Sequence, residues 1–160
     1  MTQADERAAE LARLALDHGL SIAVAESLTC GRLACSLGAA PDSSDWFRGG
    51  VVAYHPDVKH RLLDVPDVPV VSETAARAMA TGVRALVGAT AAVAVTGVGG
   101  PDPQDGEPAG SVWFAVATGG EVRAEHRTFD GDPDRVLDQT VDHALDLLLE
   151  ATKALRAENL

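Results

Sequence analysis

The chain has 160 residues, a length typical of one domain with a full hydrophobic core. Its 24 acidic residues outnumber its 13 lysines and arginines, and the net charge of −11 argues against a surface that binds nucleic acid or an anionic membrane. No stretch reaches the roughly 18–20 apolar residues of a membrane span, and Met1–Arg13 lacks the apolar core of a secretion signal. We therefore expect one domain over residues 1–160, located in the cytoplasm.

The first half of the chain alternates predicted helices with apolar strands. Ala4–His18 carries apolar residues three and four positions apart, the pattern of an amphipathic helix, and Gly19 is a natural stop. Ser21–Ala25 is a short, apolar, partly β-branched run that predicts a buried strand. The other elements expected here are a helix from Leu28 to Leu37, a strand at Arg48–Tyr54 and a short helix at Asp57–Leu63, which Pro56 introduces.

The second half combines two further helices with a strand and a hairpin. Ser72 is a suitable N-cap for a helix at Glu73–Val87, which Gly88 ends. Ala91–Thr96 is apolar without alternation, as expected of a strand covered on both faces. The remaining elements are the loop Gly97–Gly110, the strands Ser111–Ala117 and Val122–Phe129 joined by Gly119-Gly120, and the closing helix Val136–Leu155 behind Asp132-Pro133.

Together these elements predict an α/β fold. Helices that alternate with apolar strands cover both faces of a sheet, and the last two strands add an antiparallel pair. We expect a three-layer α/β/α sandwich around a mixed sheet that includes a C-terminal hairpin. Ala and Val supply much of the apolar content, with only six aromatic residues, which predicts a core of small, closely approaching elements. In such sheets ligands bind at strand ends, and this singles out the loops after Ala25 and Thr96.

Ser27 stands between the first strand and the helix expected after it. A strand that stops at small polar residues just before a helix leaves free backbone N–H groups around an exposed hydroxyl, which suits a serine nucleophile or an anion site. A serine in this position is also an ordinary helix N-cap. Ala25 and Thr29 occupy the glycine positions of the G-x-S-x-G elbow, and no histidine follows in a Ser-His-Asp arrangement.

Lys59 is the residue that could activate Ser27. It lies about one turn into the predicted helix that Pro56 opens, where the helix dipole and partial burial both lower the pKa of a lysine. A neutral lysine amine can accept the proton of a serine, as in the Ser–Lys variants of the hydrolase triad. Tyr54, at the end of the preceding strand, could orient Lys59 or donate to a substrate. The alternatives are a surface lysine and a half-buried aromatic residue at the sheet edge.

Two further segments could bind a ligand. Thr96-Gly97-Val98-Gly99-Gly100-Pro101 follows a buried strand, and its glycines allow backbone N–H groups to approach an anion or an amide. The segment matches neither a P-loop nor the dinucleotide fingerprint, and a tight turn is the alternative. Arg135 lies in the first turn of the last helix, where it could reach a phosphate or pair with a neighbouring aspartate.

The two cysteines fit neither a disulfide framework nor a metal site. Cys30 and Cys35 are close together in the predicted helix, where we expect them to be small residues packed inward. Reduced thiols agree with a cytoplasmic location.

Taken together, these segments resemble the C-terminal domain of the CinA proteins, the nicotinamide-nucleotide amidase (PncC) family. Ala-Glu-Ser-Leu-Thr-Cys-Gly, which contains Ser27, is similar to the family signature A-E-S-C-T-G-G. The similarity continues in chain order through Ser43-Ser44-Asp45-Trp46-Phe47, Gly50-Val51-Val52-Ala53-Tyr54, Val71-Ser72-Glu73, Ala94–Pro101, Gly110–Phe114 and Gly131-Asp132. It spans nearly the whole chain, which makes it more specific than any single motif.

The resemblance implies an amidohydrolase that converts nicotinamide mononucleotide to nicotinate mononucleotide and ammonia, in pyridine-nucleotide salvage. The family serine falls on Ser27 and the family lysine on Lys59, so Ser27 would attack the carboxamide with Lys59 as base. Backbone N–H groups at the start of the following helix would form the oxyanion hole. Neither a metal nor an organic cofactor is implied. The residues expected to bind substrate are Glu26, Leu28, Thr29, Gly31, Thr96, Gly97, Gly99, Gly100 and Arg135.

The sequence departs from the family pattern beside the nucleophile and at the last helix. Leu28 and Cys30 replace a cysteine and a glycine of the signature, and Pro133 and Leu137 stand where the family usually has arginines. Two other functions stay open: a catalytically silent module that binds a nucleotide or a partner, and an amidase for a related amide. The expected partner is a small-molecule nucleotide, and the domain is expected to form a homo-oligomer.

Overall fold

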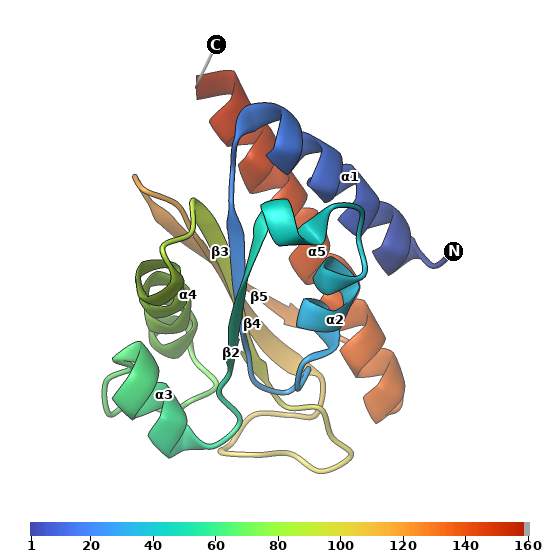
Figure 1. Ribbon diagram of the computed structural model, residues 1–160. Coiled ribbons are helices and arrows are strands. Elements are labelled where there is room, and N and C mark those ends of the chain that lie inside the picture. The colour runs from blue at the N-terminus through green and yellow to red at the C-terminus, as the bar shows by residue number, and fades with distance from the viewer. Residues whose placement is uncertain (159–160) are drawn as a thin grey trace.

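A five-stranded mixed sheet forms the centre of the computed structural model, which describes residues 1–158 (Figure 1). The strands, in spatial order, are β2 (Phe47–Val52), β1 (Ile22–Glu26), β3 (Ala91–Gly97), β4 (Ser111–Ala117) and β5 (Val122–Thr128). β1 runs parallel to β2 and β3, whereas β4 is antiparallel to β3 and β5. The predicted α/β fold with a mixed sheet and a C-terminal hairpin is confirmed.

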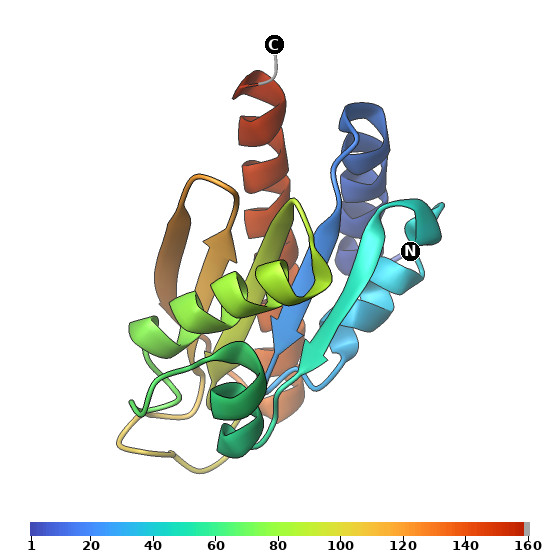
Figure 2. The same cartoon turned by 60° about the vertical axis from the view of Figure 1, so that its left-hand side comes forward.

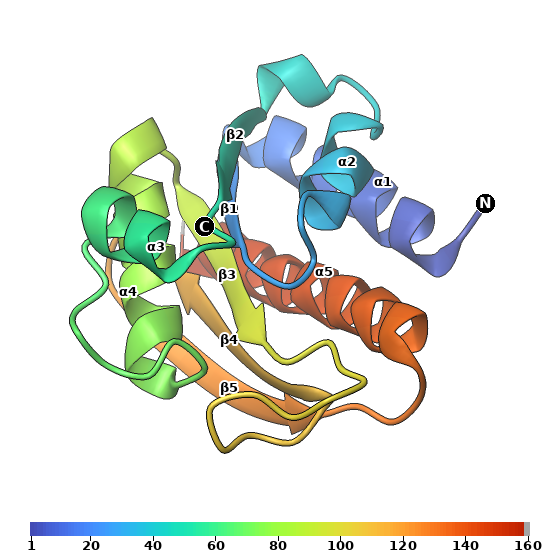
Figure 3. The same ribbon diagram turned by 90° about the horizontal axis from the view of Figure 1, so that it is seen from below.

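Helices cover both faces of this sheet (Figure 2). One layer holds α1 (Gln3–His18), α2 (Arg32–Gly38) and α5 (Pro133–Glu158), and the other holds α3 (Pro56–Leu63) and α4 (Glu73–Val87). Figure 3 shows the two layers on opposite sides of the strands. A short 3-10 turn, η1 (Ser43–Asp45), leads into β2.

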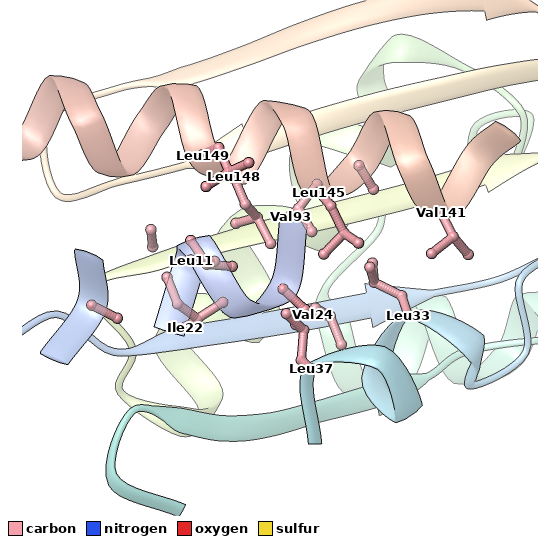
Figure 4. Close-up of a cluster of buried hydrophobic side chains, with 14 of the residues drawn as sticks. Leu11, Ile22, Val24, Leu33, Leu37, Val93, Val141, Leu145, Leu148 and Leu149 are labelled. Carbon is pink, nitrogen blue, oxygen red and sulfur yellow. The ribbon is translucent and has the colours of Figure 1, made fainter. Parts of the chain in front are cut away.

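Side-chain size differs between the two faces of the sheet. Toward α1, α2 and α5, β1 presents Ile22 and Val24, which join a cluster of buried leucines (Figure 4). Toward α4, β1 presents Ala23 and Ala25, and α4 itself contributes mainly alanines to the contact. Burying a leucine contributes about 1.5–3 kcal/mol, so the first face supplies most of the hydrophobic stabilisation. Small side chains on the second face favour a close approach of helix and sheet.

The segment that follows β1 differs from the predicted helix. The helix predicted from Leu28 begins only at Arg32, and the residues between Ser27 and α2 form a turn. In this turn Cys30 (φ 47°) and Gly31 (φ 98°) have positive φ angles, which a right-handed helix cannot include. The N-cap position of α2 is Gly31, so Ser27 does not cap it. Cys30 and Cys35 are exposed, and the expectation that they pack inward was wrong.

The other boundaries shift less. β2 ends at Val52, two residues before Tyr54, and α5 begins at Pro133 rather than at Val136. Asp132 accepts the N–H of Arg135 at 2.9 Å and thereby caps α5. Within residues 1–158, the helices lack the combination of length and apolarity that crossing a membrane requires.

Candidate active site

Loops at one end of the sheet enclose a cleft of about 430 Å³. Three of its walls follow β1, β2 and β3, because the C-terminal ends of parallel strands meet at the same edge. The connection before α4 and the first turns of α5 complete the walls. Of the residues singled out in the sequence, the cleft brings together Ser27, Leu28, Tyr54, Lys59, Thr96, Gly97, Gly99 and Gly100.

Lys59 reaches Ser27 from α3. Its Nζ lies 3.0 Å from Ser27 Oγ, 2.6 Å from the carbonyl oxygen of Ala53 and 3.4 Å from that of Tyr54. The sequence separation of 32 residues is bridged by the parallel pairing of β1 with β2, in which Glu26 lies opposite Val52. α3 then starts at Pro56 and turns the lysine back toward the end of β1.

Burial sets the charge preference of this lysine. Lys59 is 1% exposed, and no carboxylate of residues 1–157 lies within ion-pair distance of its Nζ. Burial lowers the pKa of Lys59 to about 8, since a buried ammonium loses hydration that no anion replaces. A substantial fraction of the amine is therefore neutral near pH 8, and it lies within hydrogen-bond distance of a hydroxyl. A hydroxyl beside a neutral amine is the arrangement that a nucleophile and its general base require.

Tyr54 contacts Lys59 through its backbone carbonyl rather than through its hydroxyl. The side chain is 66% exposed and lines the mouth of the cleft. Its ring is available to a ligand, whereas the orientation of Lys59 comes from main-chain oxygens.

Glu26 has a role in the fold that the sequence did not reveal. Its side chain is fully buried, and its two carboxylate oxygens accept the N–H groups of Leu33 and Ala34 at 2.9 and 3.0 Å. A charged acceptor at a helix N-terminus is favourable, and Gly31 has no side chain to supply one. Glu26, at the end of β1, thus caps α2. The N–H groups of Leu33 and Ala34 are therefore not free to form the predicted oxyanion hole.

Replacing Glu26 with alanine is expected to lower the free energy of unfolding by about 2–4 kcal/mol, because two buried N–H groups lose their acceptor. Urea denaturation followed by circular dichroism measures this change. Glu6→Ala, in the exposed first turn of α1, is the matched control and should cost less than about 0.5 kcal/mol. A similarly small effect at Glu26 would show that the cap contributes little.

The turn after Ser27 carries other backbone donors. The N–H of Cys30 donates to the Ser27 carbonyl oxygen at 3.1 Å, and the N–H of Arg32 donates to that of Thr29 at 3.0 Å. In the described part of the chain, the N–H groups of Leu28 and Thr29 have no acceptor within hydrogen-bond distance. These two groups immediately follow the Ser27 hydroxyl in the chain.

The end of β3 and the glycine-rich segment that follows it form another wall of the cleft. The buried Thr96 hydroxyl donates to the Val70 carbonyl oxygen at 2.7 Å, which ties the connection before α4 to β3. A Cβ atom at Gly97 would lie 2.6 Å from the carbonyl oxygen of Ser111, so β3 and β4 can approach this closely only at a glycine. Gly99 has open space around it and faces the cleft.

Four of the expected substrate-binding residues lie outside the cleft lining: Glu26, Thr29, Gly31 and Arg135. On α5 the lining residues are Pro133 and Leu137, four positions apart and therefore on one face. Arg135 is about 200° around the helix from Pro133 and is exposed. The helical period alone shows that Arg135 does not share a face with Pro133 and Leu137, but the face that meets the cleft is set by the packing of α5. Among residues 1–157, no three His, Cys, Asp or Glu side chains gather closely enough to hold a metal ion.

Comparison with known sequences places the chain in a family. The model of the CinA C-terminal domain matches residues 4–152. The nicotinamide-nucleotide amidohydrolase PncC of Pseudomonas putida is 44% identical over 135 residues, covering 81% of this chain and 84% of that protein. A CinA-like protein of Citrifermentans bemidjiense is 41% identical over 145 residues. That match covers 86% of this chain but only 35% of the longer relative.

Solved structures agree with the fold. A CinA superfamily protein from Klebsiella pneumoniae matches with a TM-score of 0.90 at 34% identity, covering 94% of this chain and 98% of that one. A competence or damage-inducible protein from Enterobacter asburiae matches with a TM-score of 0.91 at 31% identity, covering 95% and 99% of the two chains. Both the family model and these relatives cover most of the chain, and the chain therefore belongs to the CinA C-terminal domain family.

Proposed function

We propose that this chain is an amidohydrolase that converts nicotinamide mononucleotide to nicotinate mononucleotide and ammonia. The observation that carries the proposal is the 3.0 Å contact between the buried Lys59 amine and the Ser27 hydroxyl at the cleft. The relative from P. putida is a nicotinamide-nucleotide amidohydrolase, which supports the choice of substrate. The acid product would serve pyridine-nucleotide salvage.

The surroundings of Lys59 favour its action as a base. A neutral amine has two N–H bonds and one lone pair. The carbonyl oxygens of Ala53 and Tyr54 can only accept hydrogen bonds, so they take the two N–H groups. The lone pair is then left for the Ser27 hydroxyl hydrogen, and the proton can transfer along this contact.

The reaction follows in two halves. Ser27 Oγ attacks the carboxamide carbon while Lys59 takes the hydroxyl proton, and the N–H group of Leu28, which lines the cleft, stabilises the oxyanion. Lys59 then returns the proton to the amide nitrogen, the C–N bond breaks, and ammonia leaves an ester on Ser27. In the second half, water attacks the ester with Lys59 again as base, and the acid is released as Ser27 regains its proton.

An ammonia assay tests the proposal. Purified protein incubated with nicotinamide mononucleotide should release one ammonia for each nicotinate mononucleotide that chromatography detects. Heat-denatured protein is the control for spontaneous hydrolysis. If the native protein releases no ammonia above that control, the proposed function is wrong, and a silent binding module becomes the better description.

The activity is expected to rise with pH. Protonated Lys59 cannot accept a proton, and burial lowers its pKa to about 8. The value of kcat/KM should therefore increase about tenfold per pH unit below that pKa and level off above it. Initial rates at low substrate concentration across this range measure the profile. A profile that is flat, or that falls as pH rises through 8, would contradict a lysine base.

A further inference from the structure

We propose that the cleft selects a carboxamide carried by a nucleoside and draws little binding energy from a phosphate group. The inference rests on the amidohydrolase function proposed above and concerns the substrate class of the same cleft. It follows from the charges that line the cleft and from those that surround α5.

The lining offers a phosphate no available cation. Among the lining side chains that the structure describes, Lys59 is the one cation and Asp102 the one carboxylate. Lys59 is 1% exposed, and its amine already contacts Ser27 and two carbonyl oxygens. It therefore belongs to the reacting end of the cleft and cannot reach a phosphate at the far end of the substrate.

The N-terminus of α5 does not supply an anion site either. Pro133 lines the cleft at the first position of the helix and has no N–H to donate. The Asp132 carboxylate already accepts the N–H of Arg135, so an anion occupies the place where a phosphate would bind. Leu137, one turn further along, adds an apolar side chain to the same wall.

The arginines near this wall are either paired with aspartates or turned away from the cleft lining. Arg32 forms ion pairs with Asp134 at 3.2 Å and with Asp138 at 3.5 Å. Arg135 is exposed and lies outside the cleft lining. With a net charge of −11, the protein repels a phosphate dianion. The negative net charge, together with Asp102 in the lining, favours binding of a pyridinium ring, which carries a positive charge.

The inference predicts similar kcat/KM values for the nucleotide and the nucleoside. The value of kcat/KM for nicotinamide mononucleotide should be within about threefold of that for nicotinamide riboside, which lacks the phosphate. Loss of a phosphate contact to a charged side chain would instead cost roughly tenfold to a hundredfold.

Two variants sharpen the test by adding a cation to the α5 wall. Leu137→Arg is expected to raise the ratio of nucleotide to nucleoside kcat/KM at least tenfold. Pro133→Arg, at an exposed position, should raise it in the same direction if the half-buried Leu137 variant folds poorly. Leu16→Arg is the matched control, because Leu16 is 40% exposed on α1. The C-terminal end of α1 lies near the start of β1, at the end of the sheet away from the cleft (Figure 1). This control should leave the ratio unchanged.

The outcomes separate the two proposals. Comparable rates on both substrates, with a raised ratio in the arginine variants, support the inference. A wild-type preference of tenfold or more for the nucleotide overturns the inference and leaves the proposed function standing. If neither substrate releases ammonia, the proposed function fails and the inference fails with it.

Discussion

Ser27→Ala is expected to lower kcat/KM for ammonia release by at least about a thousandfold. Alanine has no hydroxyl to form the ester, and the remaining backbone donors can only orient the substrate toward water. Ser27 is 9% exposed and loses one oxygen, so the free energy of unfolding should change by less than about 1.5 kcal/mol. Steady-state ammonia release and urea denaturation measure the two effects.

Ser44→Ala is the control for this substitution. Ser44 is exposed in η1 and does not line the cleft, so its variant should keep wild-type activity. If Ser27→Ala retained more than a tenth of the wild-type kcat/KM while folded, another group would have to be the nucleophile.

Lys59→Arg is expected to lower kcat by a factor of about 10² to 10⁴, the usual contribution of a general base. Arginine keeps the positive charge and the donors for Ala53 and Tyr54, but it does not lose its proton in proteins. A role as a structural cation would survive this change, whereas a role as base would not. Lys59→Met removes the amine altogether and should be as inactive as Lys59→Arg.

Lys153→Arg is the matched control, since Lys153 is exposed on α5 and pairs with Glu10 at 3.4 Å. Its activity and pH profile should equal those of the wild type. Near-normal turnover by Lys59→Arg, with the pH profile unchanged, would show that Lys59 is not the base.

Much of the fold could be predicted because it depends on local patterns. The apolar run at Ser21–Ala25, the cap at Ser72 and the Gly119-Gly120 turn each specify a short segment, and each lies where expected. The order of the strands could not be predicted. β1 lies between β2 and β3 because of pairing between distant segments, which periodicity within one segment does not encode.

The sequence singles out residues of the candidate site but does not show how they are arranged. Ser27 and Lys59 stood out from their sequence context, but their contact depends on the register of β1 against β2. The family resemblance implies that Glu26 binds substrate, but the sequence does not show that this strand residue caps the helix that follows it. Arg135 was favoured for its charge, whereas the rotation of α5 places Pro133 and Leu137 on the cleft.

The proposed mechanism requires that Ser27 carries the acyl group during turnover. Acid quenching of the protein during hydrolysis of nicotinamide mononucleotide, followed by peptide mass analysis, detects this intermediate. We expect the peptide that contains Ser27 to gain the mass of the acyl group while substrate remains, and added hydroxylamine to divert the product to a hydroxamate. Steady ammonia release with an unmodified Ser27 peptide and no hydroxamate would show that the reaction does not pass through an ester on Ser27.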